Sequence, residues 1–332
     1  MSQAPSFTLP GDPLCRHWVE LTGANPHLTR EFRPTLVTLY SSSYSREPGI
    51  AGTGFVIASN ENFVVIATAK HVLEYLPRVQ NPYSVAGASS PFKPAAQLPN
   101  LHKGKVKIVF ANDEIAGMFD VVYACVNEST DIAICIAEIR KEFQNSTKFV
   151  TVPFDLTTPK VGEIVHIASL VHPLKRIEVT ETEQGILNFE MERKVDIRRG
   201  VVTSVHMTGF RQYNWPCFTT SIPVQFGMSG GFVYIPRDRA TVSACGVVCV
   251  EVSQEVDPTS YNSLGESVIG CGWTALALRL PNKLPQADDK DTSTIFSMMQ
   301  NGSFPMASNG IGHIRFEEGQ NGDAKIGLVH PI

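Results

Sequence analysis

The feature that most constrains this chain is its series of short β-branched and aromatic segments, each followed by a turn rich in serine, asparagine or glycine. These segments do not alternate with helical ones, which argues against a doubly wound α/β fold. Many short strands separated by turns are typical of antiparallel barrels and sandwiches. The sequence therefore predicts a mainly β protein. The expected strands are 35–41, 53–59, 63–67, 106–111, 121–127 and 132–137, and then 164–169, 201–206, 218–222, 232–235, 243–252 and 268–275.

These strands form two sets, separated by a polar stretch that contains Pro153 and Pro159. We expect a helix over 13–21 in the N-terminal arm. Residues 77–105 are rich in proline and long for a connection between strands, so we expect a lid or a specificity element. The charged residues 178–199 form either a long exposed hairpin or a mobile loop. The expected units are an N-terminal arm (1–34), a first β-barrel (35–150), a second β-barrel (151–280), and a C-terminal linker and tail (281–332).

Composition limits the classes of partner. The chain has 332 residues, of which 43% are hydrophobic, so it can bury a large core. Its formal net charge of −4 gives no reason to expect a nucleic-acid partner. Neither a secretory signal nor an apolar stretch of membrane-spanning length is visible, so we expect a cytoplasmic location without membrane contact. Seven cysteines without a C-x-x-C pair predict buried free thiols, and no metal or cofactor is expected.

One turn carries the strongest chemical signal, Gly227-Met-Ser229-Gly-Gly231. Glycine permits the sharp backbone turn that would place the Ser229 hydroxyl at a tip. The same turn would direct the N–H groups of Gly227 and Ser229 at one point, as an oxyanion hole requires. The alternative is a glycine-rich hairpin turn whose serine has no chemical role.

A nucleophilic serine needs a base and an acid that orients the base. Among nine histidines, His71 stands out because it follows an apolar strand and lies where a helical pattern, residues 68–76, begins. Asp131 opens the apolar segment 132–137, where one end of a carboxylate can be buried. Its alternative role is an ordinary turn aspartate. Asp113 and Asp120 are rivals, but neither precedes a comparable run of small apolar residues.

Four motifs follow one another along the chain: Gly52-Thr-Gly-Phe55, Ile66-Ala-Thr-Ala-Lys-His71-Val, Thr130-Asp131-Ile-Ala-Ile134 and Gly227-Met-Ser229-Gly-Gly231. In this order they resemble the motifs of the chymotrypsin-fold, or trypsin-like, serine proteases. The likeness is closest to the bacterial branch that includes the HtrA-type enzymes, here without a PDZ domain, and it covers roughly residues 35–280.

The resemblance implies a double six-stranded β-barrel with a cleft between the barrels. It implies that Ser229 is the nucleophile, that His71 is the general base and then the acid, and that Asp131 orients His71. The amides of Gly227 and Ser229 would form the oxyanion hole. Met228 stands where many relatives have aspartate or asparagine, so activation through an ion pair of that aspartate with a new N-terminus is not expected.

The resemblance also suggests where a substrate binds. Val248, Cys249, Val250 and Glu251 resemble the strand that pairs with substrate backbone. Pro223 lies where trypsin-like members carry an acidic pocket floor, so a pocket for basic residues is not supported. Glu251 either supplies negative charge from another wall or faces solvent at a strand end.

Together these features predict a cytoplasmic, metal-independent serine endopeptidase that acts on protein or peptide substrates. One alternative is a protein of the same fold that binds peptides without cleaving them. Another is an esterase, which the absence of α/β alternation disfavours. A regulatory partner and a homo-oligomer both stay open.

Overall fold

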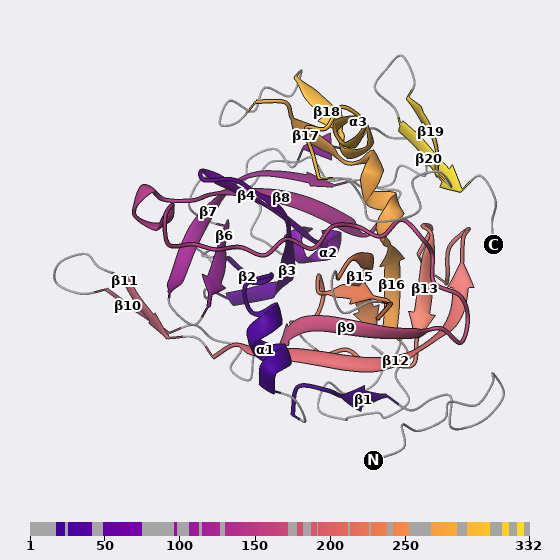
Figure 1. Cartoon of the computed structure of the whole chain (residues 1–332), viewed down its shortest axis with the longest axis horizontal. Coiled ribbons are helices and arrows are strands. Elements are labelled where there is room, and N and C mark those ends of the chain that lie inside the picture. Colours follow the sequence, from indigo (N-terminus) through magenta and orange to yellow (C-terminus); the bar gives the residue numbers. More distant parts are fainter. Residues whose placement is uncertain are drawn as a thin grey trace.

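The computed structural model shows two β-barrels packed side by side (Figure 1). The first, in indigo to magenta, is formed by β2 to β8, and the second, in pink to orange, by β9 and β12 to β16. Most of the loop 77–105 lies outside the described residues. The structure describes residues 18–23, 26–41, 49–74, 96–97, 106–112, 115–126, 130–171, 178–181, 187–190, 192–211, 213–225, 227–237, 242–251, 267–283, 291–305, 314–318 and 324–328.

The first barrel is an antiparallel sheet in the order β7-β6-β2-β3-β4-β8. A second pairing between β8 and β7 closes the sheet, so both of its edges are hydrogen-bonded. The short strand β5 pairs with β7 outside this ring. The strands are β2 (Leu36–Ser41), β3 (Gly49–Ser59), β4 (Phe63–Ala69), β5 (Ala96–Gln97), β6 (Val106–Ala111), β7 (Ala116–Val126) and β8 (Ile132–Glu138).

The second barrel repeats this plan in the order β12-β13-β16-β15-β14-β9, and pairing of β9 with β12 closes it. The N-terminal strand β1 (Val19–Glu20) adds to β12 from outside. The expected fold class, a mainly β double barrel of the chymotrypsin-like type, is confirmed by this topology. The strands are β9 (Ile164–Val171), β12 (Lys194–His206), β13 (Cys217–Thr220), β14 (Phe232–Tyr234), β15 (Ala244–Glu251) and β16 (Ser267–Cys271).

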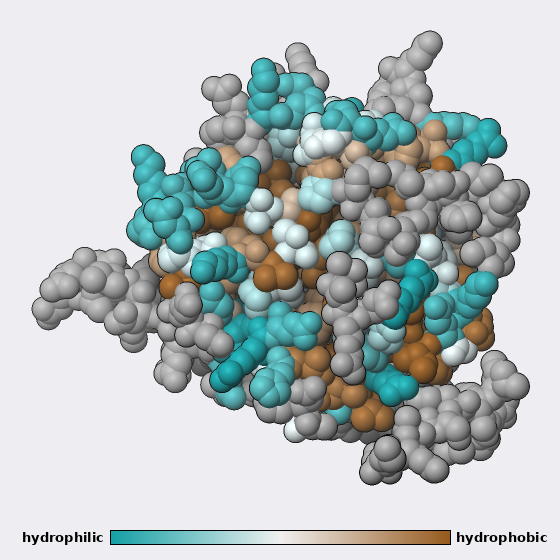
Figure 2. Space-filling view, viewed as in Figure 1, coloured by the Kyte–Doolittle hydropathy of each residue, from teal (hydrophilic) through white to brown (hydrophobic). Residues whose placement is uncertain are grey.

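The two barrels share one continuous hydrophobic core. Phe55 of β3 lies with its ring centroid 5.1 Å from that of Phe232 of β14, and 6.0 Å from that of Phe154 in the connection between the barrels. Aromatic side chains of this size dominate the energetics of a core. The interface between the barrels is therefore packed like an interior, whereas the outer face in Figure 2 mixes hydrophilic and hydrophobic residues.

Short elements cover and connect the barrels. The helix α2 lies between them and α1 lies across their junction in the view of Figure 1. The C-terminal segment packs on the body, because the buried Ile295 donates its N–H to Leu278 O at 2.9 Å. These elements are α1 (Pro26–Phe32), α2 (Lys70–Glu74), η2 (Lys141–Phe143), η3 (Gly272–Ala277), α3 (Ile295–Gln300), β10 (Glu178–Glu181), β11 (Leu187–Glu190), β17 (Arg279–Pro281), β18 (Thr292–Thr294), β19 (Ile314–Glu318) and β20 (Ala324–Leu328).

Three local predictions differ from the structure. The expected helix over 13–21 is wrong where it can be seen, because residues 19–20 form the strand β1. The charged segment 178–199 begins as the hairpin β10–β11, but from residue 194 it is the barrel strand β12. The charged residues of this segment predicted exposure to solvent, yet Asp196 and Arg198 form a buried ion pair. The expected strand 268–275 ends at Cys271, where the chain enters η3.

The cysteine prediction is confirmed for the six cysteines that the structure describes, which are all buried free thiols; Cys15 lies outside the described residues. In the same part of the chain, no group of three or more His, Cys, Asp or Glu side chains is placed to hold a metal ion. No helix there is long and apolar enough to cross a membrane.

Candidate active site

His71 is positioned by the pairing of β4 with β8. The register places Ala69 opposite Ile132, and Lys70 N continues the ladder by donating to Asp131 O at 2.7 Å. The chain then turns into α2, so His71 lies at the junction of strand and helix, as its sequence context suggested. Two residues sixty positions apart in the sequence are thereby neighbours.

Asp131 holds His71 through two hydrogen bonds. His71 N donates to Asp131 Oδ1 at 3.1 Å, and His71 Nδ1 lies 2.8 Å from Asp131 Oδ2. An ionised carboxylate only accepts hydrogen bonds, so Nδ1 is the donor in this contact. The His71 and Asp131 side chains are 24% and 13% exposed, so the imidazole is partly accessible to solvent while its partner is more enclosed.

Two further residues lie near Asp131. The buried thiol of Cys249 donates to Val247 O at 3.3 Å, and burial, followed by the negative charge of Asp131, raises the pKa of this thiol well above its usual range. The thiol therefore stays protonated beside the carboxylate. On the other side, the Thr130 hydroxyl lies 2.6 Å from the Thr274 hydroxyl of η3. The start of β8 is thus tied to the second barrel.

The turn that carries Ser229 is fixed mainly by its carbonyl groups. Gly227 and Gly230 have φ values of +90° and +87°, which side-chain-bearing residues rarely adopt. A Cβ added to Gly230 would lie 1.9 Å from Thr53 O, so the first barrel leaves no room there. Thr53 also binds the turn directly: its hydroxyl donates to Gly227 O at 2.6 Å and its N–H donates to Ser229 O at 2.8 Å.

The N–H groups of this turn divide into two kinds. Those of Met228, Gly230 and Gly231 donate to main-chain carbonyls at 2.8–3.0 Å. Those of Gly227 and Ser229 donate to no acceptor among the residues that the structure describes. A trans peptide directs its C=O and N–H to opposite sides, so the bond from Gly231 N to Met228 O turns Ser229 N–H the other way. Two main-chain donors therefore stay available where the sequence predicts an oxyanion hole.

Ser229 lies close to the elements that carry His71 and Asp131. Its hydroxyl donates to Cys249 O at 3.1 Å, and Cys249 lies near enough to Asp131 for the carboxylate charge to raise the pKa of its thiol. A Cβ added to Gly52 would lie 2.8 Å from both Ser229 O and the Val72 side chain of α2. The structure thus brings the three predicted residues to one region between the barrels.

The predicted substrate strand is β15. Its pairing with β14 ends at Val247. The next residue, Val248, pairs with the Ser229 turn instead: Gly230 N donates to Val248 O and Val248 N donates to Gly231 O, both at 2.8 Å. On the opposite edge, Val250 and Glu251 pair with β16 after a register shift at Cys249. Pro223 is half-buried, and its carbonyl accepts a hydrogen bond from Arg198 Nη1 at 2.6 Å.

Of the rival acids, Asp120 lies elsewhere, and so do the histidines His166 and His206. Asp120 of β7 pairs with Lys107 of β6, and Asp113 lies outside the described residues. His166 of β9 contacts the Tyr234 hydroxyl at 3.1 Å; burial and then the charge of Arg199 lower its pKa to about 4. His206 of β12 contacts the Ser204 hydroxyl.

Sequence reasoning missed the residues that support this region. Thr53 belongs to the motif Gly52-Thr-Gly-Phe55, but only the fold shows that its hydroxyl binds Gly227 O of the other barrel. Asp196 and Arg198 were hidden in a segment whose charges suggested solvent. The sequence predicted that Cys249 contacts the substrate, which stays a prediction, but it did not indicate that the charge of Asp131 acts on the Cys249 thiol. No local pattern marks these contacts, because each joins residues far apart in the chain.

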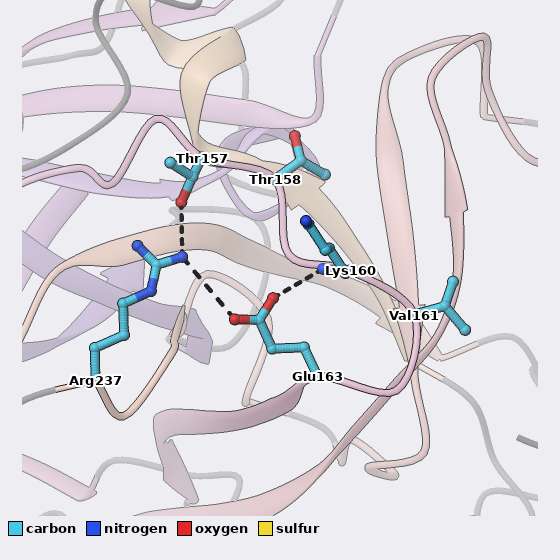
Figure 3. A pocket seen from close by; sticks show the side chains of 6 residues that line it. All are labelled: Thr157, Thr158, Lys160, Val161, Glu163 and Arg237. Atoms are coloured by element: carbon cyan, nitrogen blue, oxygen red, sulfur yellow. Dashed lines mark hydrogen bonds and ion pairs between the residues drawn. The ribbon is translucent and has the colours of Figure 1, made fainter. Parts of the chain in front are cut away.

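A separate surface pocket is lined by none of these residues (Figure 3). In it, Arg237 extends toward Thr157 and Glu163, and Arg237 Nη1 lies 3.2 Å from the buried carboxylate of Asp155. Lys160 N also donates to Glu163 Oε2 at 2.9 Å. This pocket is therefore a local polar network apart from the candidate site.

In comparisons with known proteins, this chain is similar only to solved structures, and that similarity is distant. Neither a protein-family model nor a curated protein matches this chain. Among solved structures, the MamO protease domain from Magnetospirillum magneticum in its apo form is 13% identical with a TM-score of 0.40, covering 73% of this chain and 93% of that one.

Two further solved structures are similarly distant. Rv3671c from M. tuberculosis H37Rv, a serine-to-alanine mutant in an inactive form, is 17% identical with a TM-score of 0.38, covering 76% of this chain and 89% of that one. The structure of GrC is 12% identical with a TM-score of 0.42, covering 74% and 92%. At this level of similarity, the conclusions about this chain depend on its own topology and site geometry.

Proposed function

We propose that this chain is a serine endopeptidase that hydrolyses peptide bonds in protein substrates through an acyl-enzyme. Ser229 is the nucleophile, His71 the general base and then the acid, and Asp131 the group that orients His71. The motif likeness to the HtrA-type branch belongs to this proposal. Neither a metal nor a cofactor takes part in it.

The observation that carries the proposal is the pair of hydrogen bonds from His71 to Asp131, at 3.1 and 2.8 Å. They hold the ring in one orientation, and a neutral ring that donates from Nδ1 would use Nε2 as the proton acceptor. The Ser229 proton is directed at Cys249 O in the present arrangement. Rotation of the hydroxyl toward His71 Nε2 would place that proton where the base removes it as oxygen attacks the substrate carbonyl.

The Gly227 and Ser229 amides would stabilise the resulting oxyanion. Donors whose direction is set before the reaction cost no reorganisation when charge develops, and loss of one typically slows catalysis by about two to three orders of magnitude. Thr53 and β15 hold the carbonyls of this turn, so the two free N–H groups are held by the fold. Collapse of the tetrahedral species would return the proton from His71 to the leaving amine.

Substrate backbone would bind in extended form along residues 249–251, because Val248, the first residue of the predicted substrate segment, already pairs with Gly230 and Gly231. An added strand gains affinity from main-chain hydrogen bonds. Pro223, at the proposed pocket floor, has its carbonyl bound by Arg198, so we expect no preference for basic side chains.

A fluorophosphonate probe tests the proposal. A serine activated by the His71–Asp131 pair should react with the probe in the wild type, and Ser229→Ala should abolish the reaction. Cleavage of a peptide library should then identify the bonds that are hydrolysed. Peptide binding without labelling would favour the non-cleaving alternative, and labelling with hydrolysis of short-chain esters alone would favour an esterase.

A further inference from the structure

A buried ion pair lies behind the candidate site. Arg198 Nε and Nη2 donate to Asp196 Oδ2 at 3.0 and 2.8 Å, and each side chain is only 5% exposed. Burying two charges costs more free energy than their attraction usually returns. Asp196 Oδ1 adds to this cost, because it has no hydrogen-bond partner among the residues that the structure describes. The pair therefore calls for an explanation other than stability.

The third nitrogen of the Arg198 guanidinium suggests a reason for keeping this buried pair. Arg198 Nη1 donates to Pro223 O at 2.6 Å. Pro223 begins the segment that leads to Ser229, and Met228 N closes the turn by donating to Gln225 O at 3.0 Å. Thr53 holds the far end of this segment through Gly227 O. Arg198 thus holds the near end and Thr53 the far end of the same turn.

The N-terminal arm covers the other side of Arg198. The Trp18 ring lies over the guanidinium, with Arg198 Cζ 4.9 Å from the ring centroid. β1 pairs with β12 so that Glu20 lies opposite Arg198, and Leu21 N donates to Ile197 O at 2.8 Å. A desolvated cation over an indole is favourable, so the arm helps to fix the orientation of the guanidinium.

We propose that Arg198 is a positioning residue for the turn that carries the nucleophile, and that Trp18 of the N-terminal arm holds Arg198 in place. This inference rests on the proposed function for its effect on catalysis. Arg198 fixes Pro223, and through residues 223–229 it sets the direction of the Gly227 and Ser229 amides. The arm is then part of the machinery that shapes the oxyanion hole, although it contributes no reacting group.

Lysine separates the two roles of Arg198. The planar guanidinium binds Asp196 with two nitrogens and Pro223 O with the third. A lysine ammonium is a single point of charge, so it neutralises Asp196 without also reaching Pro223 O in the arginine geometry. Arg198→Lys should keep the barrel folded while it releases the turn.

Arg237 offers a matched control in the same barrel. Its guanidinium also binds a buried carboxylate, Asp155 at 3.2 Å, and a further oxygen, Thr157 Oγ1 at 3.1 Å (Figure 3). Its interactions in the described part of the chain do not include residues 223–229. Arg237→Lys makes the same chemical change away from the turn.

The experiment compares both lysine variants with the wild type by amide hydrogen exchange, fluorophosphonate labelling, peptide hydrolysis and thermal melting. In Arg198→Lys we expect amides 224–230 to exchange roughly fivefold faster. We expect labelling and kcat to fall roughly tenfold while KM changes by less than about threefold, because the lost bond acts mainly through the oxyanion hole. Arg237→Lys should match the wild type in exchange, labelling and kcat.

Two additional variants keep the test decisive if Arg198→Lys unfolds. Asp196→Asn with Arg198→Met leaves no buried charge, and it should still show fast exchange and slow labelling. Trp18→Leu removes the ring and should shift exchange in the same direction, whereas Trp18→Phe should shift it less. Wild-type exchange and labelling in Arg198→Lys or in the double variant would overturn the proposal.

Failure of the proposed function would look different. A wild type that neither reacts with the probe nor cleaves peptides would contradict the peptidase assignment. Hydrogen exchange of residues 224–230 would still report whether Arg198 holds the turn. Normal catalysis in the wild type together with unchanged exchange in the variants would reject the Arg198 inference alone.

Discussion

At the scale of single residues, the proposed chemistry depends on which atom carries each proton. Asp131 accepts two N–H groups of one residue, the main-chain and ring donors of His71. The ring therefore cannot rotate without loss of a hydrogen bond. Burial, followed by the charge of Asp131, raises the pKa of the Cys249 thiol well above its usual range, so this thiol stays protonated near the proposed orienting acid. The fold thus sets the orientation of the His71 ring before the proposed reaction begins.

Asp131→Asn should lower kcat/KM for a peptide substrate by roughly three to four orders of magnitude. An amide has one oxygen in place of two, so it cannot accept both His71 donors without a change of ring orientation or tautomer. The size of the side chain is nearly unchanged, so the melting temperature should stay close to that of the wild type.

The rival acid provides the control for this change. Asp120→Asn removes an ion pair with Lys107 on the first barrel and should leave kcat/KM within about twofold of the wild type, as expected of a partly exposed pair. Equal losses in the two variants would contradict the assignment of Asp131.

A second residue-scale prediction concerns His166 and pH. Burial, followed by the charge of Arg199, lowers the pKa of His166 to about 4 from its ordinary value of 6.5, while its Nδ1 contacts the Tyr234 hydroxyl. Between these two values the unfolded chain binds a proton that the folded chain does not. Stability should therefore fall as pH decreases through this window and level off below it.

Urea denaturation measures this effect. Between about pH 7 and about pH 5, the wild type should lose on the order of 1 kcal/mol more unfolding free energy than His166→Gln, whose amide does not titrate. The same decline in both proteins would show that other groups cause the loss.

At the scale of elements, local pattern predicted the strands better than their ends. β-branched residues favour extended backbone wherever they pack, so the twelve barrel strands were visible in the sequence. The first half of β12 was not visible in the sequence, because Asp196 and Arg198 look like exposed charges. Their burial depends on the ion pair between them and on the Trp18 ring over Arg198. Cys245 and Cys249 are four residues apart and would share one face of a regular strand, but the register shift in β15 places them in different hydrophobic clusters.

In the candidate site, too, local features could be predicted from the sequence and long-range contacts could not. The turn around Ser229 was predictable because glycine spacing is a local signal. The proximity of His71 to Asp131 follows from the register of β4 against β8, which the chain order of the motifs only implies. The roles of these residues stay predictions, and so do the domain boundaries.

Thr53 of β3 gives a prediction at this scale. Its hydroxyl donates to Gly227 O at 2.6 Å and accepts from Leu170 N of β9 at 3.1 Å. Thr53→Val keeps the shape but leaves both buried groups unpaired, so the unfolding free energy should fall by roughly 1–3 kcal/mol. Fluorophosphonate labelling should slow by about tenfold as the turn loses this tether. Thr53→Ser retains the hydroxyl and should label nearly as fast as the wild type. Equal labelling rates in the two variants would show that the Thr53 hydroxyl does not hold the turn.

At the scale of the whole molecule, the site exists only while both barrels are docked. His71 and Asp131 belong to the first barrel, and Ser229 and β15 to the second. The hydroxyl pair of Thr130 and Thr274 crosses between them at 2.6 Å, in addition to the shared core. An interface packed like an interior couples the folding of its two sides. The barrels should therefore unfold together.

The tryptophans allow this coupling to be measured. All three contact the second barrel or its extensions: Trp18 covers Arg198, Trp215 packs with Cys217 and Cys249, and Trp273 lies in η3. Tryptophan fluorescence consequently reports on the second barrel, whereas far-UV circular dichroism reports on both. In urea the two signals should give one midpoint, and fluorophosphonate labelling should be lost at that same midpoint. A circular dichroism transition that continues after the fluorescence change is complete would mean that the first barrel is stable alone, and that docking of the barrels is a separate equilibrium on which the site depends.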